Sequence, residues 1–164
     1  GLAAVALLNA YLSRVRDDRL RQQSSEQVMN AVCAEIGYIR HESGVLRQTL
    51  DSTFDEGIHL TVNIEKVLRF SEPLVYHNNL DKLGTLSFEA NTKLVKLYCM
   101  VGEYNKGISG YTDNEIEHIN QNKKAYETFL KVAMDRLDTV TELANDALLT
   151  LGRERSAQTV PKNM

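Results

Sequence analysis

The stretch that decides the fold is residues 126–151, which read YETFLKVAMDRLDTVTELANDALLTL. Apolar side chains recur in it at intervals that alternate between four and three residues. This average spacing of about 3.5 residues places them on one face of a helix that packs against other helices. The residues on that face are Tyr126, Leu130, Ala133, Leu137, Val140, Ala144, Ala147 and Leu151. If residues 113–152 form one helix, it is about 60 Å long.

A second apolar stripe lies in the first third of the chain. Its members are Val28, Val32, Ile36, Ile39, Leu46 and Leu50. Their spacing predicts one long helix, or two joined helices, over residues 13 to about 52. The polar run 21–27 leaves two interpretations open. It is either a solvated stalk, or Ser24 and Gln27 form a capping box that begins a new helix.

The middle of the chain predicts two shorter helices. Residues 51–57 have a turn composition, and a helix is expected from about residue 58 to 71, ended by Pro73. Residues 74–86 form a connector, in which Gly84 is expected to adopt a left-handed conformation. Ser87 then caps a helix that runs to about Lys106. Its apolar inner face is formed by Leu94, Leu97, Val101 and Ile108.

The remaining boundaries complete the predicted architecture. Residues 106–111 contain two glycines and predict a loop, and Thr112 or Asp113 begins the last helix. Gly152 is expected to end that helix, which leaves a flexible tail over residues 153–164. The predicted fold is all-α, an elongated antiparallel helical bundle with coiled-coil character over residues 28–152.

The composition fits one folded domain. The chain has 164 residues, of which 43% are hydrophobic and 25% charged. Its net charge is -3 and its Lys and Arg residues form no cluster, which argues against a nucleic-acid partner. Two cysteines are too few for a disulfide scaffold.

The first residues, 1–12, read GLAAVALLNAYL and carry no charge. Arg14, Arg16, Arg19 and Arg21 follow, together with Asp17 and Asp18. We therefore expect residues 1–12 to be the C-terminal part of a transmembrane helix, and residues 13–27 to be a basic and polar juxtamembrane stalk. Lys and Arg beside a span favour the cytoplasm for the following domain. The alternatives are the start of a core helix and the remnant of a signal peptide.

No common catalytic or nucleotide-binding motif is present, so no catalytic residue and no cofactor is predicted. Two Glu-x-x-His pairs, Glu56 with His59 and Glu115 with His118, are the candidate metal ligands. Two such pairs help to hold the metals of ferritin-like di-iron bundles. Both pairs lie at predicted helix starts, where carboxylates also stabilise the helix dipole without any metal.

The connector carries a resemblance to a known group of proteins. The residues that carry it are Pro73, Leu74, Val75, Tyr76, Asn79, Leu83, Gly84, Thr85, Leu86, Val95 and Tyr98, with the run AVCAEIGYI at 31–39. This pattern resembles uncharacterised small bacterial proteins that have an N-terminal membrane helix and a Pro…Tyr…Leu-Gly-x-Leu connector in a helical cytoplasmic region. The resemblance implies a single-pass protein of the bacterial inner membrane and no particular activity.

These features favour a membrane-anchored helical interaction or scaffold module without catalytic activity. Its partner would be a protein or a second copy, bound through a helical face, and the membrane through the N-terminal helix. The candidate partner-binding residues are Tyr126, Leu130, Leu137 and Val140. The alternatives are a bundle that senses a small ligand and a ferritin-like di-metal protein.

Overall fold

The computed structural model describes residues 2–55, 68–84 and 86–159, with the side chains at 2–12, 18, 21, 22, 53–55 and 157–159 excepted. Its elements are the helices α1 (Leu2–Asp55), α3 (Leu74–Asn78), α4 (Leu80–Leu83), α5 (Phe88–Ser109), α6 (Asp113–Gln121) and α7 (Lys123–Thr159). No strand occurs in these ranges, which confirms the predicted all-α class.

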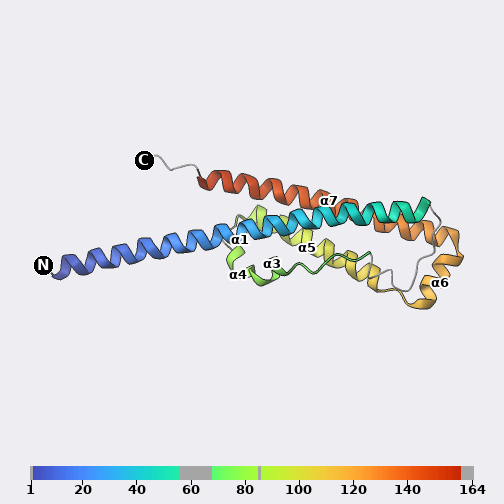
Figure 1. The fold of residues 1–164 in the computed structure, drawn as a ribbon, viewed down its shortest axis with the longest axis horizontal. Helices are drawn as coiled ribbons and strands as arrows, with labels where there is room; N and C mark the ends of the chain where they lie inside the picture. The colour runs from blue at the N-terminus through green and yellow to red at the C-terminus, as the bar shows by residue number, and fades with distance from the viewer. Residues whose placement is uncertain (1, 56–67, 85, 160–164) are drawn as a thin grey trace.

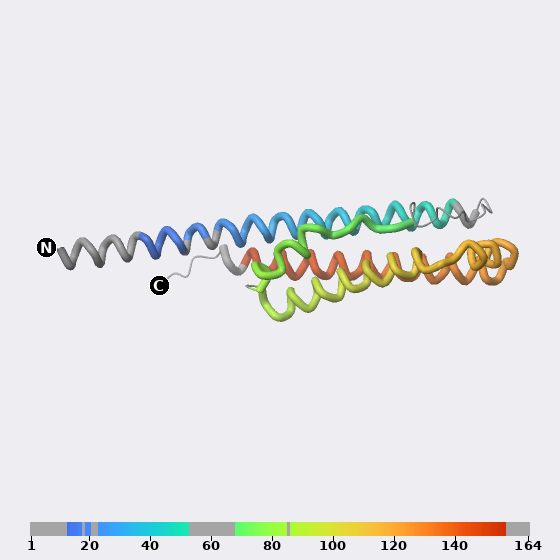
Figure 2. The backbone as a smooth tube through the Cα atoms, turned by 90° about the horizontal axis from the view of Figure 1, so that it is seen from below, coloured from blue at the N-terminus to red at the C-terminus, as the bar shows by residue number. Residues whose placement is uncertain are grey.

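The three long helices form an elongated bundle around α7. Helices α1 and α5 each pack along α7, which runs antiparallel to both (Figure 1). Helix α6 packs against the first part of α7. The described residues from Leu68 to Leu86, here called the connector, lie between α1 and α5 (Figure 2). The bundle is therefore built within one chain.

The core consists of the stripes that the sequence predicts. On α7 the side chains of Leu130, Leu137 and Val140 are completely buried. Val32 and Ile36 of α1, together with Leu94, Leu97 and Val101 of α5, are buried in the same cluster. The connector adds Phe70, whose ring meets the ring of Tyr104 edge to face with centroids 5.2 Å apart. Burial of these apolar side chains is the main favourable term in folding.

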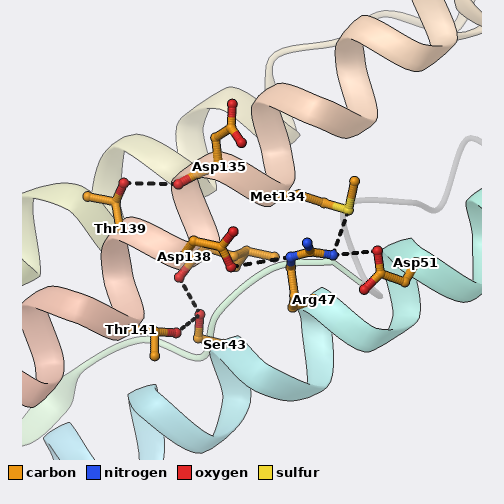
Figure 3. Close-up of polar contacts among 9 residues, drawn as sticks. Ser43, Arg47, Asp51, Met134, Asp135, Asp138, Thr139 and Thr141 are labelled. Carbon is orange, nitrogen blue, oxygen red and sulfur yellow. Dashed lines mark hydrogen bonds and ion pairs between the residues drawn. The ribbon is translucent and has the colours of Figure 1, made fainter.

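Polar contacts fix the pairing of α1 with α7 (Figure 3). The buried Ser43 hydroxyl donates to the Leu137 carbonyl oxygen at 2.8 Å and accepts from the Thr141 hydroxyl at 3.1 Å. Next to it, Arg47 binds Asp51 on its own helix and Asp138 of α7. A polar group in a core must be hydrogen-bonded, so Ser43 favours a single register of these two helices.

The structure decides the alternative left open for α1 in favour of one long helix and corrects the predicted boundary at its C-terminal end. The helix is continuous from Leu2 to Asp55, so Ser24 does not begin a new helix and the polar run 21–27 is part of α1. Residues 51–55, predicted as a turn, are helical because Leu50 is anchored in the core and Asp51 pairs with Arg47 one turn earlier. Of the helix predicted for 58–71, residues 68–71 are not helical, and the rest lies outside the described residues.

The C-terminal region also differs from the prediction. The expected helix 113–152 is two helices, because the backbone of Asn122 is extended while its side chain accepts from the Ala125 N–H and caps α7. Gly152 does not end α7. Residues 153–159 of the predicted tail are helical, where Ser156 donates to the Gly152 carbonyl and Glu154 accepts from the Ser87 N–H.

Of the two helix ends around the predicted loop 106–111, the end of α5 is shifted and the start of α6 is as predicted. Helix α5 continues to Ser109, because Ile108 is buried in the core and holds that turn in place. At Gly107 a Cβ atom would collide with the Arg136 guanidinium, so the glycine allows Arg136 to lie against α5. Thr112 and Glu115 form a capping box that begins α6, and Ser87 caps α5, as predicted. Gly84 is right-handed, with φ -60°, instead of left-handed.

The buried stripe of α7 predicts that two leucine-to-alanine substitutions on that helix change the free energy of unfolding by very different amounts. Leu137→Ala should lower the free energy of unfolding by about 2–5 kcal/mol, because it leaves a cavity between α1, α5 and α7. Leu149→Ala, at a position 63% exposed on the same helix, should change it by less than about 0.5 kcal/mol. Chemical denaturation of the two variants measures the difference, and equal effects would contradict the assigned core.

Candidate functional site

Polar side chains on α1 and α5 hold the connector between the two helices. Those on α1 are Glu35 and Glu42, and those on α5 are Asn91, Tyr98 and Asn105. Within each helix they are seven residues apart, so each set lies on one face. The connector runs antiparallel to both helices, since Phe70 lies beside Asn105, Tyr76 beside Tyr98 and Leu86 beside Asn91.

Glu35 is the centre of this arrangement. Its carboxylate accepts hydrogen bonds from the Val75 N–H at 2.8 Å, the Tyr76 N–H at 2.9 Å and the Tyr98 hydroxyl at 2.9 Å. The two N–H groups belong to the first turn of α3, where no helical carbonyl is available to accept from them. A side chain of α1 thus caps α3, a role that a nearby Ser or Asp usually has.

Two tyrosines stack beside this carboxylate. The rings of Tyr76 and Tyr98 have centroids 3.9 Å apart and are inclined by 14°. Burial raises the pKa of Tyr98 well above its usual value, and the negative charge of Glu35 raises it further. Burial also raises the pKa of the Cys33 thiol. Both groups therefore stay protonated near neutral pH and are poor nucleophiles.

The rest of the connector is held through its backbone. The Asn105 amide accepts from the Phe70 N–H at 2.9 Å and donates to the Phe70 carbonyl at 3.1 Å, which satisfies both backbone groups of one residue. Glu42 accepts from the N–H and the hydroxyl of Ser71. Phe70 and Ser71 are not helical, so their backbone groups need such partners from other parts of the chain. The arrangement is a clamp for a polypeptide segment.

The clamp brings together residues that carry the bacterial resemblance. Tyr76 and Tyr98 meet Glu35 from the run 31–39, whereas Val95 lies on the exposed side of α5. The sequence alone did not predict the roles of Glu35, Glu42, Asn91 and Asn105. The sequence pattern that could have indicated these roles is the recurrence of polar positions every seven residues beside each apolar stripe.

The candidate metal ligands are not brought together. Glu56 and His59 lie outside the described residues. Glu115 is exposed and engaged by Thr112 in the capping box, whose hydrogen bonds lower the pKa of Glu115, and His118 is exposed too. Among the described residues, no three His, Cys, Asp or Glu side chains gather where they could hold a metal ion.

The candidate partner-binding residues lie inside the bundle. Leu130, Leu137 and Val140 are fully buried against α1 and α5, and Tyr126 is half-buried at the edge of the same core. Their heptad spacing reflects packing within one chain. A partner could reach them only if the bundle opened.

Residues 2–27 of α1, here called the arm, extend beyond the bundle (Figure 1). Among the α1 side chains that the structure describes, Val28 is the first that is buried, and none of those in the arm is buried. No helix in the described part of the chain is both long and apolar enough to cross a bilayer.

A shallow groove lies at the opposite end of the bundle, between the α5–α6 turn and α7. Its volume is about 470 Å³. Tyr111, Phe129 and Val132 form its apolar wall, and Lys124, Asn122 and Thr128 line it with polar atoms. The rings of Tyr111 and Phe129 meet edge to face within it.

The clamp predicts a stability effect at Glu35. Glu35→Ala should lower the free energy of unfolding by about 1–3 kcal/mol, because two N–H groups of α3 and the Tyr98 hydroxyl lose their acceptor. Amide hydrogen exchange at Val75 and Tyr76 should accelerate in the variant. Glu142→Ala, which removes an exposed carboxylate from α7, is the control and should leave both measurements unchanged. Unchanged exchange at Val75 and Tyr76 in Glu35→Ala would contradict the clamp.

Comparison of the chain with models of protein families, with curated proteins and with solved structures finds no match. The function is therefore inferred from the residues and their contacts.

Proposed function

We propose that the chain is a membrane-anchored helical interaction module that has no catalytic activity. The observation that carries the proposal is the arm, because a helix of this length that leaves its bundle needs another surface to cover it. Isolated helices are only marginally stable in water, and most helical stability comes from packing of an apolar face.

The sequence of the arm supports a lipid membrane as the surface that covers the arm. The bundle-facing stripe of α1 stops at Val28, and the same face continues with the polar residues Ser25, Arg21, Asp18 and Arg14. Beyond them, residues 1–12 are almost entirely apolar on every face. Such a segment is suited to burial in protein or in lipid. Twelve helical residues reach about 18 Å, roughly the depth of one leaflet of a bilayer.

The charged residues of the arm also support membrane binding, and they indicate on which side of the membrane the bundle lies. Four arginines between residues 14 and 21 follow the apolar segment, at the level where lipid headgroups would lie. Basic residues beside a membrane segment favour the cytoplasmic side and attract anionic headgroups. We therefore place the bundle in the cytoplasm, at the inner membrane of a bacterium, where it would present its surfaces to a protein partner.

A second candidate function is a sensor bundle for a small ligand. The groove at Tyr111, Phe129 and Val132 supports it, because aromatic walls with a nearby Lys124 suit an aromatic or aliphatic anion. The groove lies at the end of the bundle away from the arm, so the two functions are compatible.

The arm predicts binding to lipid vesicles. The paired change Leu7→Glu with Leu8→Glu should weaken co-sedimentation with vesicles of anionic phospholipid by at least about tenfold, because each leucine gains about 1.5–3 kcal/mol from burial. The matched control is Gln23→Glu with Gln27→Glu, which adds the same charge at exposed arm positions nearer the bundle. Circular dichroism should show equal helix content in both. Failure of the unaltered chain to bind vesicles would contradict membrane anchoring.

A further inference from the structure

Helix α5 presents three stripes, and the structure accounts for two of them. The first packs into the core through Leu94, Leu97 and Val101. The second, which consists of Asn91, Tyr98 and Asn105, holds the connector and Glu35. The third lies on the side opposite the core stripe and is here called the outer stripe: Phe88, Thr92, Val95, Cys99 and Gly102.

The outer stripe has the same alternation of four and three residues as the core stripe of α7. Phe88 is 88% exposed and Val95 is 49% exposed, and Cys99 is exposed as well. A Cβ atom on Gly102 would meet nothing within 4 Å, so packing within the chain does not require this glycine. A glycine inside a helix lowers the stability of the helix by about 1 kcal/mol relative to alanine. Because glycine has no side chain, another helix can approach closely at that position.

The charges beside the outer stripe suit a second copy of the same helix. Glu89, Lys96 and Glu103 are exposed, lie seven residues apart on one flank and alternate in sign. In an antiparallel pair this flank faces its own copy. A two-fold axis at Cys99 then brings Lys96 of each chain to the level of Glu103 of the other. Charged flanking residues of this kind select the partner and the orientation of paired helices.

We infer that two copies of the chain associate through the outer stripes of α5, antiparallel, with the two Cys99 side chains facing each other across the axis. The same alignment brings Val95 to the level of Gly102 of the other copy, where there is room for it. In a parallel pair the charged flank would face Asn91, Tyr98 and Asn105, which carry no charge to pair with Lys96. Because α1 runs parallel to α5, the two arms would leave the dimer at opposite ends (Figure 1).

Cross-linking of the full chain through Cys99 tests this dimer. A Cys33→Ser background leaves Cys99 as the only thiol, and a short bismaleimide should then yield a covalent dimer at low ionic strength. Lys96→Glu replaces two attractive contacts by repulsive ones and should weaken dimerisation about tenfold. Adding Glu103→Lys to that variant restores opposite charges and should restore the yield.

Leu149→Glu places a new charge on the exposed face of α7 and should leave the yield unchanged. Absence of the Cys99 adduct in the Cys33→Ser chain would overturn the inference. A yield that Lys96→Glu does not change would overturn the antiparallel arrangement. An adduct lost in the paired Leu7→Glu and Leu8→Glu variant, with Lys96→Glu still cross-linked, would mean that the arms associate instead. Vesicle binding is measured separately, so the dimer and the membrane anchor can fail independently.

Discussion

Packing against α7 is the constraint on which the rest of the structure depends. Helices α1 and α5 both bury their apolar stripes on it, and the connector separates them from each other along much of their length. The bundle can therefore extend only as far as the stripe on each helix continues. On α1 the first described side chain that is buried is Val28, and the residues before it form the arm, which extends beyond the bundle.

The connector shows how a segment of two short helices and several non-helical residues is held between long helices. Its backbone groups find partners on the side chains of α1 and α5, and this demand explains why polar residues recur every seven residues beside the apolar stripes. Glu35 has a central role in these contacts, because it caps α3 and also accepts a hydrogen bond from the Tyr98 hydroxyl. In the sequence alone, such polar side chains could indicate a catalytic or metal site. In the structure they hold the backbone of the connector.

The arm and the outer stripe, which do not take part in the core of the bundle, indicate how the molecule acts. The arm extends beyond the bundle, and Phe88, Val95 and Cys99 of the outer stripe are exposed. They lie on different parts of the fold and would bind different surfaces, one a membrane and the other a second copy. A scaffold with two such contacts could hold partners at a fixed spacing, because α1 is a single continuous helix.

The sequence by itself determined the helical class, the buried stripes of α1, α5 and α7, and the caps at Ser87 and Thr112, because these depend on the spacing and type of residues close together in the chain. It could not determine where α1 and α7 end, or that Asn122 divides the last helix, because contacts such as Glu154 with Ser87 override local glycine signals. Only the tertiary structure decided that the stripe of α7 is satisfied within one chain and that Glu35 meets Tyr76 and Tyr98. Those outcomes depend on which helices come together, and a periodic pattern is the same for an internal and an external partner.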